Sequence, residues 1–132
     1  MTGRNHSSHF GKVVGWNGFD VLPFYKADTC NALNGTDGTI FPPFVKENDA
    51  MYVYSPEMCR SVPYARGEMM VIHNVEAYRY HVDPNALMGA EKNPDNACFC
   101  TSDDSSKCKD GIHQLDTCLN GMFLACFLNL FC

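Results

Sequence analysis

The 132-residue chain lacks the features that mark several protein classes. The apolar tail at residues 122–132 is interrupted by Asn129 and falls short of the ~20 residues that a membrane-spanning helix needs. Basic residues are outnumbered, with 10 Lys and Arg against 15 Asp and Glu, which argues against nucleic acid as a partner. Residues 1–9 contain no apolar stretch of a signal peptide. The sequence therefore indicates a mildly acidic globular chain of about one domain, which we expect to be a piece of a longer protein.

Motifs of common enzymes and metal sites are also missing. The sequence has no G-x-S-x-G nucleophile elbow, no H-E-x-x-H zinc motif and no phosphate loop ending in G-K-[ST]. The histidines have no nucleophile pattern beside them, and the acidic loop lacks the spacing of a calcium loop. These isolated side chains are His73, His81, His113, Asp103, Asp104 and Asp110. We predict no enzymatic activity, no catalytic residue, no metal and no cofactor.

Cysteine is the strongest positive feature of the composition. The eight cysteines are Cys30, Cys59, Cys98, Cys100, Cys108, Cys118, Cys126 and Cys132. Cys98 and Cys100 are two residues apart, so a bond between them would strain the short ring, and they are expected to reach separate partners. We interpret the set as disulfides formed in an oxidising compartment, in preference to clustered free thiols in a reducing one.

A zinc site is the alternative use of these thiols. Its ligands would come from Cys98, Cys100, Cys108, His113 and Cys118. Structural zinc sites favour paired C-x2-C ligands, whereas the spacing here begins C-x-C and has no second knuckle. The spacing therefore favours disulfides.

The expected regular structure is mostly β. Residues 10–25 predict a hairpin around the type I′ turn signal Asn17-Gly18, and short strands are expected at 51–54, 69–72 and 77–82. The last of these strands has the alternation of a half-buried strand, with Tyr78, Tyr80 and Val82 on one face and Arg79 and His81 on the other. Residues 88–92 are expected to form one helical turn that ends before Pro94.

Two sequons predict N-linked glycosylation. Asn34 begins the sequence Asn-Gly-Thr inside a predicted turn, and Asn5 begins Asn-His-Ser near the N-terminus. Modification of both sites requires that the chain pass through the secretory route.

A series of motifs resembles one known family, the class B scavenger receptors, over about residues 10–121. Its members include the fatty acid translocase, the lysosomal integral membrane protein and the insect sensory neuron membrane proteins. The motifs are Phe10-Gly11-Lys12, Trp16-Asn17-Gly18, Cys30-Asn31-Ala32-Leu33-Asn34-Gly35-Thr36-Asp37-Gly38, Phe41-Pro42-Pro43-Phe44, Cys59-Arg60-Ser61, Tyr78-Arg79-Tyr80, Asn93-Pro94-Asp95-Asn96-Ala97-Cys98-Phe99-Cys100, Cys108 and residues 115–121.

The resemblance implies a fold and a function. The fold would be part of a large antiparallel β-barrel with short helices, lying outside the cell or in an organelle lumen. Residues 1–9 would be an extension, residues 10–121 an incomplete ectodomain and residues 122–132 a divergent tail. The function would be that of a glycoprotein of the plasma or lysosomal membrane that binds and transports fatty acids, sterols or lipoproteins. Its membrane helices would lie outside this chain.

The resemblance also implies which cysteines are joined. The family pairing links Cys30 to Cys98, Cys59 to Cys118 and Cys100 to Cys108. Cys126 and Cys132 have no counterpart in the family, and the apolar residues between them favour burial. We expect these two thiols to stay reduced or to pair with each other.

Two alternatives remain open for the function. The chain could be a secreted, disulfide-linked interaction fragment without lipid transport, or a truncation without function. Saturable binding of a fluorescent fatty acid would count against the first, whereas the second would show as failure to secrete and rapid degradation.

Overall fold

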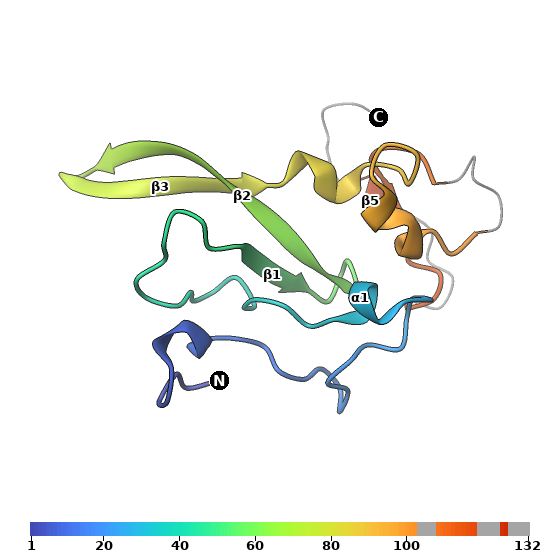
Figure 1. The fold of residues 1–132 in the computed structure, drawn as a ribbon, viewed down its shortest axis with the longest axis horizontal. Coiled ribbons are helices and arrows are strands. Elements are labelled where there is room, and N and C mark those ends of the chain that lie inside the picture. The colour runs from blue at the N-terminus through green and yellow to red at the C-terminus, as the bar shows by residue number, and fades with distance from the viewer. Residues whose placement is uncertain (103–107, 119–124, 127–132) are drawn as a thin grey trace.

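The computed structural model describes residues 1–102, 108–118 and 125–126. Its centre is an antiparallel sheet with the strand order β1-β2-β3, made of β1 (Met51–Ser55), β2 (Arg60–Ile72) and β3 (Val75–Val82) (Figure 1). Aromatic and β-branched residues are frequent in all three strands, as a pleated surface favours. The prediction of a mainly β fold with short helices is confirmed.

The remaining elements are short. They are the 3₁₀ helices η1 (Ser7–His9), η2 (Pro84–Leu87) and η3 (Pro94–Phe99), the helix α1 (Asp28–Asn31), and the paired strands β4 (Ile112–His113) and β5 (Ala125–Cys126). Asp83 and Asn93 cap η2 and η3, because each side chain accepts a hydrogen bond from the backbone N–H two residues later. A proline follows each cap, in the first helical position where its missing N–H is not needed.

Strands β2 and β3 continue beyond β1 as a two-stranded ribbon (Figure 1). Strand β1 pairs with residues 60–64 of β2, whereas β3 pairs with residues 64–72. The two long strands join through His73 and Asn74, whose φ angles of 50° and 64° are those of a type I′ loop. The ribbon therefore projects away from the part of the molecule that holds the disulfides (Figure 1).

The half-buried character predicted for residues 77–82 is wrong. Tyr78 is 48% exposed and Val82 is 40% exposed, although both are on the face expected to be buried. Tyr78 is exposed because the ribbon extends past β1, whereas Val82 pairs with Tyr64, the last residue that β1 reaches, on the edge strand of the sheet. Tyr78 is instead covered in part by the guanidinium of Arg66, which lies 3.6 Å from the ring centroid.

The hairpin predicted for residues 10–25 is reduced to its turn. Asn17 and Gly18 have φ angles of 48° and 85°, and Trp16 and Phe19 exchange two backbone hydrogen bonds of 2.8 and 2.9 Å. Beyond the turn, the flanking residues form isolated bridges with the next segment, namely Lys12 with Thr36 and Val21 with Ala32. The turn signal was therefore correct, but the ladder was wrong because the later segment supplies the pairing partners.

The single helical turn predicted at residues 88–92 is present as an isolated turn rather than as part of a longer helix. These residues form a hydrogen-bonded turn in which the N–H groups of Lys92 and Asn93 donate to the carbonyl of Gly89. Gly89 in turn packs against a distant loop, where an added Cβ would lie 2.6 Å from the carbonyl oxygen of Cys108. The turn is followed by Pro94, and the 3₁₀ helices η2 and η3 lie on either side of it.

Two small clusters form the core between the sheet and the short helices. The first contains Tyr25, Cys30, Cys59 and Leu115, with Phe24, Cys98, Phe99 and Cys118 packed against it. The second contains Met58, Val62 and Ala86, with Tyr64 and Leu87 at its edge. The first cluster gathers around two disulfides, so cross-links supply part of what a larger core would supply.

Candidate functional site

An apolar groove of about 1040 Å³ lies where β1, β2 and the end of β3 meet the N-terminal segment. Its walls include Trp16, Val53, Tyr54, Val62, Val82 and Leu87. Tyr54 and Val62 are almost fully buried in its floor, whereas Val82 is partly exposed at its edge. An open apolar hollow of this size is suited to an apolar ligand.

Trp16 is the single tryptophan of the chain, and it stands at this groove. Its bridge with Phe19 fixes the backbone, and its ring lies 5.5 Å from the ring of Tyr54, measured between centroids. The Tyr54 hydroxyl is buried without a hydrogen-bond partner among the described residues. Burial raises the pKa of this hydroxyl, which therefore stays neutral.

A close backbone contact holds the N-terminal segment against β1. The N–H of Tyr54 donates to the carbonyl of Thr36 at 2.8 Å, and the N–H of Thr36 donates to the carbonyl of Tyr52 at 3.3 Å. Gly35 lies in this contact with a φ of 81°, and a Cβ there would come 1.9 Å from the Tyr52 oxygen. Only glycine permits this approach, which brings one wall of the groove to the sheet.

A buried cation lies beside the disulfide core. Arg60 is 5% exposed, its Cζ lies 3.5 Å from the centroid of the Phe99 ring, and its Nη1 donates to the carbonyl of Ala86 at 3.1 Å. Burial lowers the pKa of Arg60 to about 10, so the guanidinium is still charged at neutral pH. Its Nε has no hydrogen-bond partner within the described residues. The Phe99 ring thus supplies part of the stabilisation that water would otherwise give.

Tyr25 and His113 meet at one backbone carbonyl, and both rings also make edge contacts with Phe99. The Nε2 of His113 lies 2.9 Å from the Met58 oxygen and 3.1 Å from the Tyr25 hydroxyl. Burial lowers the pKa of His113 from 6.5 to about 4, and burial raises the pKa of Tyr25 to about 12. Both groups are therefore neutral near pH 7, which suits a polar contact inside a core. A neutral His113 with its proton on Nε2 donates to the Met58 carbonyl.

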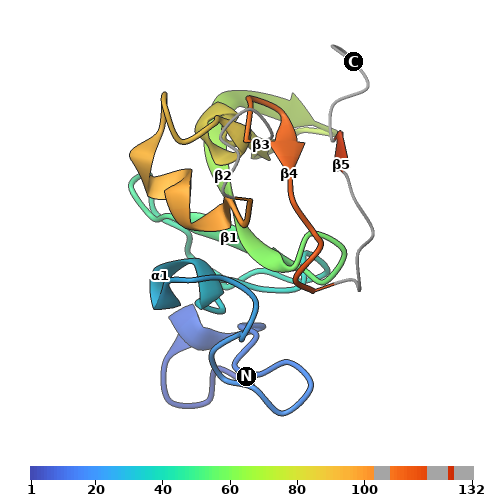
Figure 2. The same ribbon diagram turned by 90° about the vertical axis from the view of Figure 1, so that its right-hand side faces the viewer.

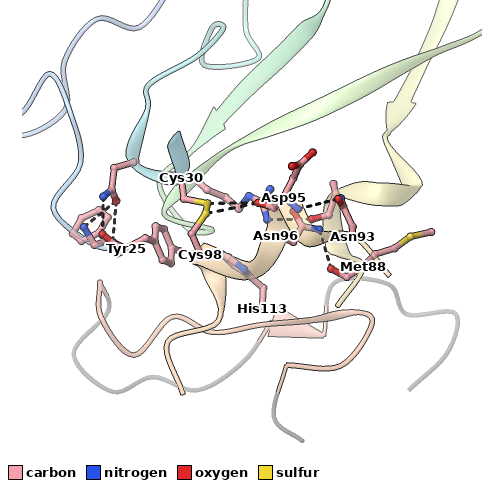
Figure 3. The surroundings of a disulfide bond; sticks show 12 residues. Tyr25, Cys30, Met88, Asn93, Asp95, Asn96, Cys98 and His113 are labelled. Atoms are coloured by element: carbon pink, nitrogen blue, oxygen red, sulfur yellow. Dashed lines mark hydrogen bonds between the residues drawn. A yellow bond between two sulfur atoms is a disulfide. The ribbon is translucent and has the colours of Figure 1, made fainter. Parts of the chain in front are cut away.

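Carboxamide side chains order the turn next to the Cys30–Cys98 bond (Figure 3). The Nδ2 of Asn96 donates to the carbonyls of Asn85 and Met88, both at 2.8 Å. The Nδ2 of Asn93 donates to the same Asn85 carbonyl at 3.1 Å. These contacts fix η2 against η3, and so fix the backbone that carries Cys98.

The structure places the predicted disulfide residues as follows. The bonds are Cys30–Cys98, Cys59–Cys118 and Cys100–Cys108, with Cα–Cα distances of 6.2, 6.4 and 5.7 Å. This is the pairing that the family resemblance implied. The three disulfides use all four cysteines of the zinc alternative. His113, its fifth candidate ligand, contacts Met58 and Tyr25. The prediction for Cys126 and Cys132 lies outside the side chains that the structure describes.

The other isolated candidates take separate positions. Asp110 accepts a hydrogen bond from the Gly89 N–H at 2.8 Å and pairs with Lys92, so it anchors a turn. His73 lies in the β2–β3 loop and His81 on exposed β3. Asp103 and Asp104 lie outside the described residues.

Both predicted glycosylation sites are accessible. Asn34 and Asn5 are exposed, whereas Thr36 of the first sequon is only 1% exposed. The Asn34 N–H donates to Ser61 Oγ at 2.8 Å, which fixes the backbone of this sequon. Since Thr36 is buried in the folded chain, an enzyme that reads the sequon must act before folding.

The apolar groove itself was not anticipated from the sequence. The sequence did contain the apolar residues that line the groove, with Val53 and Tyr54 on β1 and Val62 and Tyr64 on the neighbouring strand β2. The register that pairs β1 with β2 could not be predicted from the sequence. It depends on the four-residue turn at 56–59 that connects the two strands.

Comparison with known proteins identifies the family. The family model described as "CD36 family" matches residues 1–127. The chain belongs to the CD36 family. This finding confirms the resemblance to class B scavenger receptors.

Several curated relatives support the assignment. Lysosome membrane protein 2 of Mus musculus is 33% identical over 122 residues, which cover 92% of this chain and 24% of the relative. Sensory neuron membrane protein 2 of Heliothis virescens is 32% identical and covers 76% of this chain and 20% of its own. Scavenger receptor class B member 1 of Sus scrofa is 34% identical and covers 89% of this chain and 22% of its own.

The chain spans about a quarter of the length of the relatives that it matches. These relatives carry the names of membrane proteins and of a scavenger receptor, not of enzymes. Among the described residues, no helix combines the length and the apolar character that crossing a bilayer requires.

Proposed function

We propose that this chain forms a lipid-contacting part of a class B scavenger receptor, and that lipid lies in the apolar groove beside Trp16. The ligands would be fatty acids, sterols or the lipids of lipoproteins. The observation that carries the proposal is an open hollow of about 1040 Å³ with apolar walls, in a chain of the CD36 family. Such a hollow binds by removing apolar surface from water, which suits a ligand without a charged body.

The proposed location is the plasma or lysosomal membrane, with this region outside the cell or in the lumen. Three disulfides support an oxidising compartment, because such bonds persist there and are rare in the cytosol. We extend the proposal to N-linked glycosylation of Asn34 and Asn5, both exposed and both within sequons. The accessible position of Asn34 beside a fixed backbone supports this site more strongly than Asn5.

The single tryptophan gives a direct test of the groove. A polyene fatty acid that absorbs at the emission wavelength of tryptophan should quench Trp16 in a saturable manner, because Trp16 stands at the groove wall. The variant Val82→Asp places a charge at the edge of the groove and should weaken binding by about tenfold or more, since burial of a carboxylate is unfavourable.

Val75→Asp is the matched control for this variant. Val75 lies on the same strand and is 65% exposed, but it is not among the groove residues. It should leave the titration unchanged. Equal effects of the two variants, or quenching that never saturates, would contradict the proposal and favour an interaction fragment without lipid binding.

A further inference from the structure

A second hollow, which is mainly polar, lies beside the Cys30–Cys98 bond, with Arg60 and Phe99 among its lining residues. This cleft of about 880 Å³ is bounded by α1, by β2 and by the segment from η2 to η3. Helices α1 and η3 lie next to each other (Figure 2), joined by the Cys30–Cys98 bond. The side chains that line it include Thr29, Asn34, Ser61, Asn85, Asp95 and Phe99. Asn34, the first residue of the sequon, is thus part of the wall.

We propose that this polar cleft holds the first sugar rings of the glycan on Asn34. The inference rests on the proposed function, because the glycan is added only in the secretory route. The cleft would then be an internal glycan-binding site, in which the occupant is attached to its own wall.

The chemistry of the cleft suits a sugar. Hydroxyl, carboxamide and carboxylate groups of Thr29, Asn85 and Asp95 exchange hydrogen bonds with sugar hydroxyls. The rings of Tyr52 and Phe99 also line the cleft and offer apolar surface to the C–H face of a sugar ring. Two linked sugars are the size of a small-molecule ligand, and clefts of ~300–1,000 Å³ hold ligands of that size.

The attachment point favours docking over free motion. The Asn34 N–H donates to Ser61 Oγ, and that hydroxyl donates to the carbonyl of Ala32 at 3.1 Å, so the backbone at the attachment point is held to β2. A tethered ligand has an effective concentration in the millimolar range, so weak contacts suffice to hold it. A glycan seated here would contact both α1 and η3 and would cover the Cys30–Cys98 bond.

The test measures how fast each glycan is released from the folded protein. The whole chain is produced in the secretory pathway of animal cells, and a peptide N-glycosidase is added under native and under denaturing conditions. Mass spectrometry of the peptides gives the release rate at Asn34 and at Asn5. A docked glycan at Asn34 should be released about tenfold more slowly from the native than from the denatured chain, since a tenfold population ratio corresponds to 1.4 kcal/mol. Asn5 is exposed and does not line this cleft, so its glycan should show little difference.

The variant Ala97→Arg tests whether the cleft is the cause. Ala97 is exposed and lines the cleft on η3, so a long side chain there should displace the glycan and speed native release at Asn34 to near the Asn5 rate. Ala50→Arg is the matched control, because Ala50 is exposed and lies outside the cleft. It should leave the Asn34 glycan protected. Peptide mapping of the three disulfides verifies that both variants are folded.

Each result decides between the two claims. Slow native release at Asn34 that Ala97→Arg abolishes and Ala50→Arg preserves supports the internal glycan site. An occupied Asn34 whose glycan is released equally fast from the native and denatured chains, or equally from both variants, overturns the cleft and leaves glycosylation standing. An unoccupied Asn34 overturns the glycosylation proposal together with the cleft.

Discussion

The guanidinium of Arg60 lies over the ring of Phe99, with Cζ 3.5 Å from the ring centroid. Arg60 begins β2 directly after Cys59, and Phe99 lies between Cys98 and Cys100. The contact therefore connects the start of the sheet with the cysteine-rich segment at the point where two disulfides also meet. It is the one place in the described core where a full charge is held away from water by an aromatic face.

Removal of the aromatic face should destabilise the fold. Phe99→Leu keeps an apolar side chain but takes away the ring above Arg60, as well as the edge contacts with Tyr25 and His113. We expect a loss of about 2–4 kcal/mol in the free energy of unfolding, from the cavity left behind and from the loss of the buried cation–ring contact. Urea denaturation of the variant and of the original chain measures this difference in the free energy of unfolding. Phe44→Leu is the control, because Phe44 is 86% exposed, and it should change stability by less than about 0.5 kcal/mol.

Acid should weaken the fold through His113. The pKa of His113 is about 4 in the folded chain and near 6.5 when unfolded, so between these values the unfolded chain binds a proton that the folded chain does not. Stability should therefore fall as the pH drops from about 6.5 to about 4, by about 3 kcal/mol for this group. The measurement is the urea midpoint against pH.

The matched variant for the acid effect is His113→Gln, which keeps a donor for the Met58 carbonyl but does not titrate. Its stability should depend less steeply on pH over the same interval, whatever its absolute stability. An identical slope in the variant and the original chain would show that other groups cause the acid effect.

Loss of the longest disulfide should have a large effect. Cys98→Ser opens the bond to Cys30, which joins residues 68 positions apart. Chain-entropy arithmetic for a loop of this length gives about 4 kcal/mol of destabilisation.

Non-reducing peptide mapping of the original chain should recover the three bonds of the structure. Peptides that link Cys126 or Cys132 to any of the other six cysteines would contradict the assignment.

The strands were the most predictable part of the fold, and the long-range contacts the least. Residues 51–54, 69–72 and 77–82 all fall in observed strands, because aromatic and β-branched residues favour a pleated sheet. Asp83-Pro84 and Asn93-Pro94 each combine a cap with a proline, and this local signal could have predicted η2 and η3. Of these residues, only Pro94 was interpreted from the sequence, and only as the end of the preceding turn.

The candidate sites could be predicted only in part. The cysteine pairing followed from the resemblance, and the sequons are visible in the sequence itself. The meeting of Arg60 with Phe99, and of Tyr25 with His113, depends on segments that lie far apart along the chain. Such contacts are set by the disulfides and by the register of β1 with β2, neither of which leaves a local periodic pattern.

Photoaffinity labelling tests the central claim about lipid most directly. A fatty acid with a photoreactive group near its tail would be bound to the folded chain, irradiated and mapped by mass spectrometry. We predict that labels fall on groove residues of β1 and the start of β2, at 53–64, and on residues 82–87, and that unlabelled fatty acid competes for them. Labels on the ribbon tip at residues 68–77, or labelling without competition, would contradict a lipid site in the groove.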